Sequence, residues 1–288
     1  MPERIRVFPK KIGVVSKPDA PEAVPVLKEV VSWLHERGIE VWQGGHAQGR
    51  VSLESMPRLD LLLVLGGDGT IISVARRILG HNVPIVGINF GRVGFLAELT
   101  TTTWQKALET GLSQGILLEK RMTLHYRLER GGTVLQEGEV INDAVITRGT
   151  CARLVRLDLL LDGSPIMCLR SDGLIMSTPT GSTGYCCSAG GSLLTPGMNA
   201  FAVAAICPFL NAFSPLVLDA DSCFDVHLDD PGLDVFLTLD GQETHPLQEK
   251  DRLEVWGVPE RILMASFGIK NYFNRLCLAG FVQESKNH

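Results

Sequence analysis

Leu61-Leu-Leu-Val-Leu-Gly-Gly-Asp-Gly-Thr70 is an apolar run that leads straight into a glycine turn carrying one carboxylate. Apolar residues bounded by glycine are typical of a buried strand, and the apolar residues after Thr70 recur at helical spacing. A strand, a glycine turn and a helix in this order form a common phosphate site, because glycines let backbone N–H groups approach a polyanion. This stretch therefore predicts an α/β fold with a phosphate site at the turn.

The turn also contains a candidate base. We expect Gly66, Gly67 and Gly69 to take positive φ and to present their N–H groups to phosphates. Phosphates would repel Asp68 unless its carboxylate acts as a base on a substrate hydroxyl beside a metal-bound triphosphate, so the pattern favours a kinase. The alternative is an ordinary turn in which Asp68 caps the helix that follows.

Strands that alternate with helices are expected through the N-terminal third of the chain. The predicted strands are Lys11–Ser16, Ile39–Trp42, Leu61–Leu65 and Pro84–Asn89. This alternation predicts a parallel sheet, in which ligands bind beyond the carboxyl ends of the strands. We therefore expect the loops 66–70 and 89–95 to share one crevice.

The pattern changes to short β runs near residue 100. After a helix expected at Trp104–Leu112, the predicted strands are Leu124–Leu128, Val140–Thr147, Val155–Leu161, Ile175–Thr178, Cys223–Leu228, Val235–Leu239 and Arg252–Trp256. Glycine and aspartate turns separate these runs, as is typical of antiparallel β structure. A chain of 288 residues is long enough for two domains, which we predict to be an α/β N-terminal domain with a parallel sheet and a mainly β C-terminal domain.

Composition argues against several classes of protein. A net charge of −5 and a pI near 5.8 argue against a nucleic-acid binder, which normally carries a basic excess. No apolar run approaches the roughly 20 residues needed to span a membrane, and the N-terminus lacks a signal-peptide core, so we expect a cytoplasmic protein without a membrane partner. The seven cysteines include no Cys-x-x-Cys pair, so neither a protein metal site nor a disulfide framework is expected.

A second polar cluster follows the strand expected at Ile175–Thr178. The segment Met176 to Tyr185 is dense in hydroxyls and glycines, whose O–H and N–H groups suit a phosphate or a ribose. Asn142-Asp143 and Arg170-Ser-Asp-Gly173 place further polar groups where a strand would otherwise be apolar. Buried polar groups need partners, and a bound ligand is one way to supply them. A plain hydroxyl-rich turn is the alternative.

Together these motifs resemble the NAD kinase family. The resemblance rests on Gly66-Gly-Asp-Gly-Thr70, Gly87-Ile-Asn-Phe-Gly-Arg-Val-Gly-Phe-Leu96, Asn142-Asp143, the segment Asp172 to Thr183, and Ile206-Cys-Pro208, in the family's order and spacing. It implies an α/β N-terminal domain, a C-terminal β-sandwich domain, and a C-terminal segment that returns to the first domain. We expect domain ranges of 1–99 with 265–288, and 100–264.

The resemblance also implies an activity, which is transfer of the ATP γ-phosphoryl group to the adenosine ribose 2′-hydroxyl of NAD, giving NADP. It implies Mg²⁺ on the triphosphate and a homodimer or homotetramer, and polyphosphate is left open as a donor. Asp68 matches the family's catalytic base. The binding residues implied by the motifs are Gly66, Gly67, Gly69 and Thr70 for the phosphates, and Phe95, Asn142, Asp143, Arg170, Asp172, Thr183, Gly184 and Tyr185 for NAD.

Individual contacts follow from the same resemblance. Phe95 would pack against the adenine, Asn142 and Asp143 would bind ribose hydroxyls, and Asp172 would meet the nicotinamide end. Core packing is the alternative for Phe95, and a turn or a surface pair is the alternative for the two aspartates.

The sequence departs from the family pattern at five places. The family usually has glutamate at Asp143, glycine at Ser171 and alanine at Gly184, which are mild changes. Phe209 and Ser214 stand where the family usually has a histidine and an arginine, so two polar or cationic groups are missing. Such a change alters either assembly or nucleotide affinity.

Two other functions are compatible with these motifs. Gly-Gly-Asp-Gly turns also occur in related kinases that phosphorylate lipids or sugars, although no amphipathic docking element stands out in this sequence. A non-catalytic dinucleotide-binding homologue would keep the fold without turnover, and the retained Asp68 argues against it.

Overall fold

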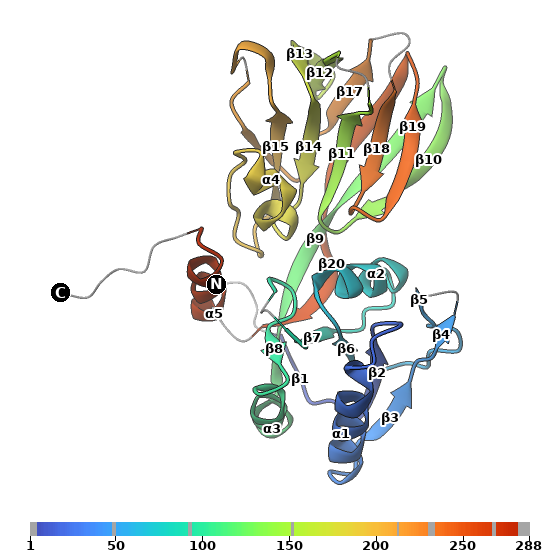
Figure 1. Cartoon of the computed structure of the whole chain (residues 1–288), viewed down its shortest axis with the longest axis vertical. Coiled ribbons are helices and arrows are strands. Elements are labelled where there is room, and N and C mark those ends of the chain that lie inside the picture. The colour runs from blue at the N-terminus through green and yellow to red at the C-terminus, as the bar shows by residue number, and fades with distance from the viewer. Residues whose placement is uncertain are drawn as a thin grey trace, which may run out of the picture. The chain divides into compact units, whose positions relative to one another are not determined.

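The chain divides into two compact units, which the computed structural model describes over residues 5–47, 50–91, 94–150, 153–211, 213–229, 234–266 and 269–281 (Figure 1). The first unit holds residues 1–120 and 262–288, and the second holds residues 121–261. The expected divisions at 99/100 and 264/265 thus fall at 120/121 and 261/262. The first division lies later because Trp104 and Leu108 pack into the core of the first unit.

The first unit is built on a parallel sheet. Its elements are β1 (Ile5–Val7), β2 (Lys11–Ser16), α1 (Ala23–His35), β3 (Glu40–Gln43), β4 (His46–Ala47), β5 (Arg50–Val51), β6 (Leu61–Leu65), α2 (Asp68–Arg77), β7 (Ile85–Asn89), β8 (Leu99–Thr100), α3 (Trp104–Gln114), α5 (Ile269–Leu278) and the nearer ends of β9 (Ile116–Arg130) and β20 (Asp251–Ala265). Strands β3, β2, β6 and β7 are neighbours in that order, and every pair is parallel. The predicted parallel sheet is confirmed.

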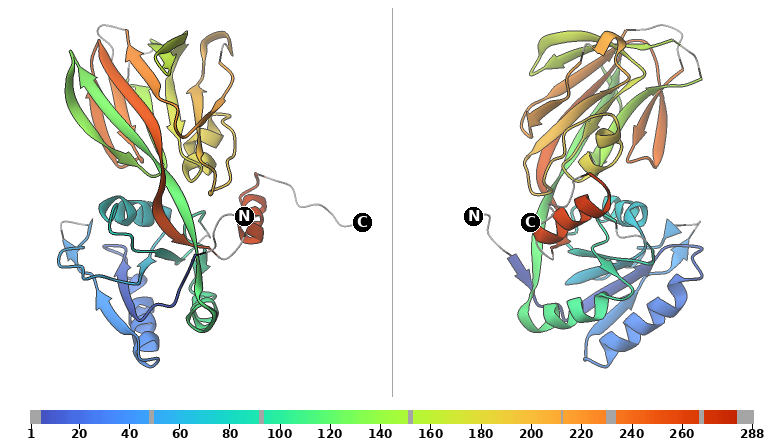
Figure 2. Two further views of the ribbon diagram at one scale, coloured as in Figure 1. Left: turned by 180° about the vertical axis from the view of Figure 1, so that it is seen from behind. Right: turned by 60° about the vertical axis from the view of Figure 1, so that its left-hand side comes forward.

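Helices cover both faces of this sheet, with α1 and α3 on one face and α2 on the other (Figure 2). Leu61, Leu63 and Leu65 join the core with α1 and α3, in which the Trp33 and Trp104 rings meet edge to face at 5.4 Å. The other residues of β6 are equally buried. A strand buried on both faces needs a continuous apolar sequence, which explains the run that opens at Leu61.

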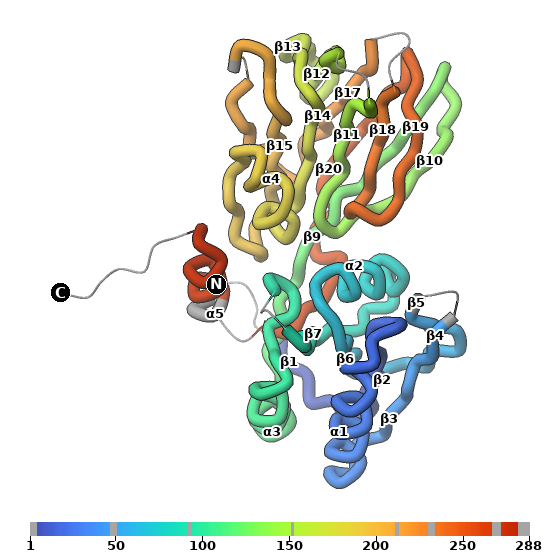
Figure 3. Tube along the Cα trace, viewed as in Figure 1, coloured from blue at the N-terminus to red at the C-terminus, as the bar shows by residue number. Residues whose placement is uncertain are grey.

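The C-terminal segment belongs to the first unit, as predicted. Strand β20 and helix α5, the last described elements of the chain, are at the red end of the colour scale in Figure 3. Met264 of β20 pairs in parallel with Ile85 of β7, which adds a strand to the sheet. The strands β6 and β7 are therefore flanked by segments from both ends of the chain, β2 on one side and β20 on the other.

The second unit is a sandwich of two antiparallel sheets. Besides β9 and β20, its elements are β10 (Thr133–Val140), β11 (Asp143–Arg148), β12 (Val155–Leu161), β13 (Ser164–Ser171), β14 (Gly173–Ser177), η1 (Gly181–Thr183), α4 (Tyr185–Ser188), β15 (Ala200–Ile206), η2 (Phe209–Asn211), β16 (Leu216–Asp219), β17 (Phe224–Leu228), β18 (Val235–Leu239) and β19 (Glu243–Leu247). One sheet has the order β16-β15-β14-β11-β18-β19, and the other contains β13-β12-β17-β20 with β9 and β10. Apolar side chains from both sheets form one core, so the predicted β-sandwich is confirmed.

One predicted strand is wrong in a way that concerns the site. The run 140–147 is broken, because β10 ends at Val140 and β11 begins at Asp143. At the break, the N–H groups of Ile141 and Asn142 donate to the side chain of Asp240 instead of to a strand. The strands that were not predicted are β1, β4, β5, β8, β13, β15, β16, β19 and all but the last residue of β10. Among the described helices, none has the length and apolar character needed to cross a membrane.

Candidate functional site

The glycine turn of the first unit joins β6 to α2, with Gly67 as the residue before the helix. The expected positive φ is wrong, since Gly67 has φ −81° and neither Gly66 nor Gly69 is left-handed. Space explains the glycines better. A Cβ on Gly66 would lie 2.7 Å from Thr70 Oγ1, whereas a Cβ on Gly67 or Gly69 would meet nothing within 4 Å.

The open space at Gly67 and Gly69 lies at the N-terminus of α2. Backbone N–H groups and the positive end of the helix dipole favour an anion at such a position. Because packing does not require glycine at these two positions, their lack of side chains keeps the approach to the helix end clear. The local structure therefore suits a phosphate, although the three glycines do not take the predicted left-handed conformation.

Asp68 is anchored by the loop that follows β7. Its carboxylate accepts hydrogen bonds from the backbone N–H groups of Phe95 (2.8 Å), Leu96 (3.1 Å) and Ala97 (3.1 Å). The N-cap of α2 is Gly67, and the Asp68 side chain accepts its hydrogen bonds from the loop and not from its own helix, so the capping alternative is wrong. A Cβ at Gly94 would overlap the carboxylate, which explains that glycine. The two loops expected in one crevice are therefore in direct contact.

The loop that anchors Asp68 is itself fastened to α5. Glu98 and Arg275 form an ion pair at 2.9 Å, in which both side chains are only 7% exposed. The Phe95 ring packs edge-on against Tyr272, with centroids 6.4 Å apart, and Phe281 lies 5.8 Å away. Phe95 is half-buried in this aromatic group. Sequence reasoning missed Glu98 and Arg275, because they lie 177 residues apart and outside every motif.

In the second unit, Asn142 and Asp143 lie at the bend between β10 and β11. No described donor reaches the buried Asn142 Oδ1. The Asp143 carboxyl is buried, and burial raises its pKa to about 7, with the nearby charge of Asp240 contributing in the same direction. Asn142 Oδ1 and the Asp143 carboxylate thus have no donor among the described residues, and a hydroxyl-bearing ligand could supply one.

The hydroxyl-rich loop divides into an internal and an accessible part. Thr178 Oγ1 donates to Ile141 O at 2.6 Å, and Ser182 Oγ donates to Pro179 O at 2.8 Å, so these two hydroxyls hold the loop together. Thr183 is half-buried, and Gly184 and Tyr185 are exposed. The three loop residues predicted to bind NAD are therefore the ones a ligand can reach.

Arg170 and Asp172 form a separate group in the second unit. Asp172 Oδ1 accepts from Arg148 Nε at 2.6 Å, and the Arg170 guanidinium lies 5.0 Å from the Phe209 ring centroid. In the antiparallel β11–β14 pair, Asp143 lies opposite Ser177, and Thr147 lies opposite Gly173. Because Asp172 directly precedes Gly173, Asp143 and Asp172 lie near opposite ends of this strand pair. At about 3.3 Å per residue, they are about 17 Å apart. The structure does not bring Arg170 and Asp172 together with Asn142.

The described residues include one group that could offer several metal ligands, namely Cys223, Asp225 and Glu254. Arg252 pairs with both carboxylates, at 2.7 and 2.5 Å, and Arg127 pairs with Glu254 at 3.4 Å, so two arginines compensate the two negative charges. All six cysteines in the described ranges are free, and Cys151 lies outside them. Burial raises the pKa of Cys186 to about 11, which makes its thiol unreactive.

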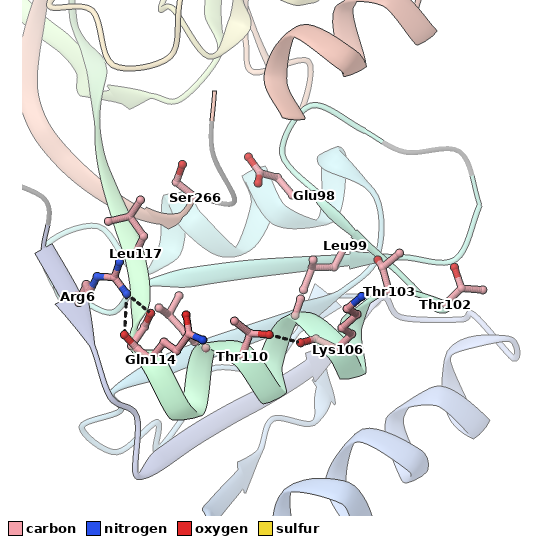
Figure 4. A pocket seen from close by; sticks show the side chains of 14 residues that line it. Arg6, Glu98, Leu99, Thr102, Thr103, Lys106, Thr110, Gln114, Leu117 and Ser266 are labelled. Carbon is pink, nitrogen blue, oxygen red and sulfur yellow. Dashed lines mark hydrogen bonds between the residues drawn. The ribbon is translucent and has the colours of Figure 1, made fainter. Parts of the chain in front are cut away.

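A cavity of about 700 Å³ lies in the first unit along α3 (Figure 4). Arg6 and Lys106 contribute cations to its lining, and Arg6 donates to Gln114 O at 2.6 Å. Neither the glycine turn nor Asp68 lines it. The cavity is therefore distinct from the predicted site.

Comparisons with known proteins match both parts of the chain to one family. Residues 12–116 match the family model of the ATP-NAD kinase N-terminal domain, and residues 141–266 match that of the ATP-NAD kinase C-terminal domain. The NAD kinase of Nitratidesulfovibrio vulgaris (strain Hildenborough) is 42% identical over 278 residues, covering 96% of this chain and 92% of the relative. The NAD kinase of Geotalea daltonii is 37% identical, covering 93% and 96%.

Solved structures share the fold. Yeast NADH kinase, crystallised with NADH, has a TM-score of 0.82 at 23% identity, covering 97% of this chain and 89% of that chain. An NAD kinase from Archaeoglobus fulgidus in complex with ATP has a TM-score of 0.77 at 22% identity, covering 94% and 99%. At these identities the likeness supports the fold alone.

Proposed function

This chain belongs to the NAD kinase family, and on that premise we propose that it transfers the γ-phosphoryl group of ATP to the adenosine ribose 2′-hydroxyl of NAD, giving NADP and ADP. The observation that carries the residue assignment is the Asp68 carboxylate, which three backbone N–H groups hold beside an open helix N-terminus.

Asp68 is the base in this proposal. A carboxylate has about four acceptor positions, and the described residues occupy three of those on Asp68, which leaves one for the 2′-hydroxyl. As the ribose oxygen bonds to the γ-phosphorus, the bond from that phosphorus to the bridging oxygen breaks and ADP leaves. The hydroxyl proton passes to Asp68. The three N–H groups fix the carboxylate's direction, so little reorganisation accompanies the transfer.

The glycine turn serves the triphosphate. The N-terminus of α2 and the clear space at Gly67 and Gly69 suit an approaching phosphate, with Thr70 in the first turn of the helix. A kinase of this family is consistent with a divalent cation, and we assign Mg²⁺, which would neutralise charge on the transferred group. Outside the arginine-compensated group in the second unit, the described residues form no cluster of metal ligands, which fits an ion that is held mainly by ATP.

The second unit supplies the contacts to NAD. Asn142 Oδ1 and the Asp143 carboxylate lack donors in the described protein, and ribose hydroxyls would provide them. Thr183, Gly184 and Tyr185 lie on the accessible part of the hydroxyl loop. Arg170 and Asp172 remain assigned to the nicotinamide end, and one ligand reaches both groups only if it extends along β11.

Assembly and location complete the proposal. We assign a homodimer or homotetramer, which the exposed apolar side chains of Ile166, Phe209, Leu210 and Val217 on and beside β13 and β16 support. The six free cysteines suit the reducing cytoplasm.

The test is an assay of the purified protein with Mg²⁺, NAD and either ATP or polyphosphate, in which an NADP-specific dehydrogenase detects the product. Asp68→Asn alone is ambiguous, because its amide would also turn a donor toward the N–H groups of the anchoring loop. Gly94→Ala displaces the carboxylate while leaving it ionisable, and Gly91→Ala is the matched control because its Cβ would meet nothing within 4 Å.

We expect NADP formation by the wild type and by Gly91→Ala, and losses of at least a hundredfold in kcat for Gly94→Ala and Asp68→Asn. Full activity of Asp68→Asn overturns the base assignment. Binding of NAD without NADP from either donor supports the non-catalytic homologue, and phosphorylation of a lipid or sugar instead of NAD supports the other alternative.

A further inference from the structure

The turn residue Asp240 is the common acceptor for the bend that carries Asn142 and Asp143. We propose that Asp240 is a positioning residue for NAD binding, which fixes this bend and sets the pH range over which Asp143 can accept a hydrogen bond from a ribose hydroxyl. The inference deepens the proposed function and rests on it.

The geometry around Asp240 is specific to the bend. Its Oδ1 accepts from the N–H groups of Asn142 (2.6 Å), Ile141 (3.0 Å) and Asp143 (3.3 Å). In return, Asp240 N donates to Asp143 O at 2.9 Å. Asp240 is 8% exposed and has φ 53°, between β18 and Gly241, which has φ 64°. Aspartate tolerates this left-handed conformation better than most residues, so the turn can aim a carboxylate at the neighbouring strand.

The carbonyl side of the bend is fixed by the hydroxyl loop. Thr178 N donates to Asn142 O at 2.8 Å, and Thr178 Oγ1 donates to Ile141 O at 2.6 Å. A Cβ at Gly181 would overlap Asn142 O, so the loop can pack this closely only as glycine. With the N–H groups and these carbonyls both engaged, the backbone cannot turn to satisfy the side chains. The Asn142 Oδ1 and Asp143 carboxylate acceptors are therefore held ready for a ligand.

Charge adds a second effect of Asp240. The titratable groups that face Asp143 are Asp240 from the β18–β19 turn and Cys186 from α4, and Ser177 is its partner across β14. Burial and the Asp240 charge raise the Asp143 pKa to about 7. The ionised carboxylate is the stronger acceptor, so NAD affinity should fall as the pH drops through about 7. Removal of the Asp240 charge lowers the Asp143 pKa and moves that midpoint to lower pH.

The test compares NAD dissociation constants from calorimetry across about pH 5.5 to 8.5 for the wild type, Asp240→Asn and Asp162→Asn. Asp162 is a matched control, because it also precedes a glycine in a strand turn, has φ 50°, and accepts one backbone N–H, from Cys223 at 2.9 Å. Melting temperatures confirm that each variant is folded.

For Asp240→Asn we expect a dissociation constant about tenfold larger at pH 8, a midpoint at least about half a pH unit lower, and kcat at saturating NAD within about twofold of wild type. Asp162→Asn should match the wild type. An unchanged midpoint in a folded Asp240→Asn, an equal effect of Asp162→Asn, or a loss confined to kcat overturns the proposal.

A second variant covers the case in which Asp240→Asn does not fold. Asp143→Asn cannot ionise, so its NAD affinity should be independent of pH between about 6 and 8. Retention of the wild-type pH dependence in this variant overturns the proposal. If the wild type binds no NAD at any pH, the proposed function fails together with this inference, and that result differs from every failure of the variants alone.

Discussion

Replacement of Asp143 by asparagine should stabilise the protein at alkaline pH while it weakens NAD binding. Asp143 is buried, and burial with the charge of Asp240 raises its pKa from 3.8 to about 7. Because the folded-state pKa lies above the unfolded one, the stability that the protonated carboxyl provides is fully present below pH 3.8. It is then lost as the pH rises through about 7.

The size of this effect follows from the two pKa values. The difference is about 3 units, and each unit corresponds to 1.36 kcal/mol, so ionisation of Asp143 removes up to about 4 kcal/mol of stability by pH 8. Asparagine keeps the shape and cannot ionise. We therefore expect Asp143→Asn to gain about 2 to 4 kcal/mol relative to the wild type between pH 4.5 and pH 8, with a gain that grows steadily up to about pH 7 and levels off above it.

The measurement is urea unfolding at several pH values, in which unfolding is monitored by hydrogen exchange in peptides that cover β11 and β14. This local readout is needed because the two units need not unfold together. Asp219→Asn is the control, since Asp219 is also an aspartate of the second unit but is exposed on the edge strand β16. A stability difference between Asp143→Asn and wild type that is the same at pH 4.5 and pH 8 would refute the reasoning.

Three further predictions concern the first unit and the loop after β15. Gly67→Ala should leave the melting temperature unchanged and raise KM for ATP about tenfold, because its Cβ would meet no protein atom. Gly66→Ala should lower the free energy of unfolding by about 1 to 3 kcal/mol, because its Cβ would collide with Thr70. Glu98→Gln leaves Arg275 buried without a counter-charge, so thermal unfolding should show a loss of about 3 to 5 kcal/mol, and kcat should fall as the loop that anchors Asp68 loosens. Phe209→His should alter NAD affinity or the sedimentation behaviour more than kcat, and a change confined to kcat contradicts it.

The strongly periodic parts of the fold could be predicted from the sequence. Strand β2 has the predicted bounds, and β6 is buried on both faces as its five apolar residues require. Two of the strands that were missed carry weaker patterns, since β13 is mostly exposed and β15 is an alanine-rich run. Neither alternation nor bulky β-branched side chains marked them, and these are the usual signals of a strand.

The site could be predicted as a set of motifs but not as a set of contacts. The motif around Asp68 indicated a carboxylate in a glycine turn, yet it could not show that the loop after β7 supplies three N–H donors. The expected positive φ at the glycines was wrong, because the motif does not reveal whether a glycine serves conformation or space. The ion pair between Glu98 and Arg275 joins segments that are distant in sequence, and a single sequence carries no signal for such a contact.

Asp68 and Asp240 show why the same local chemistry gives two different roles. Each carboxylate accepts three backbone N–H groups from a neighbouring loop, and each therefore replaces strand pairing at a place where the chain turns. Asp68 is the first residue of a helix whose N-terminal glycines leave open space, and in the proposed function its remaining acceptor position takes the substrate hydroxyl. Asp240 is buried in a turn, so its effect passes to the neighbouring bend, where Asn142 and Asp143 have acceptors without donors among the described residues. The proposed catalytic and positioning carboxylates are thus distinguished by what lies beyond their hydrogen bonds, which only the three-dimensional structure shows.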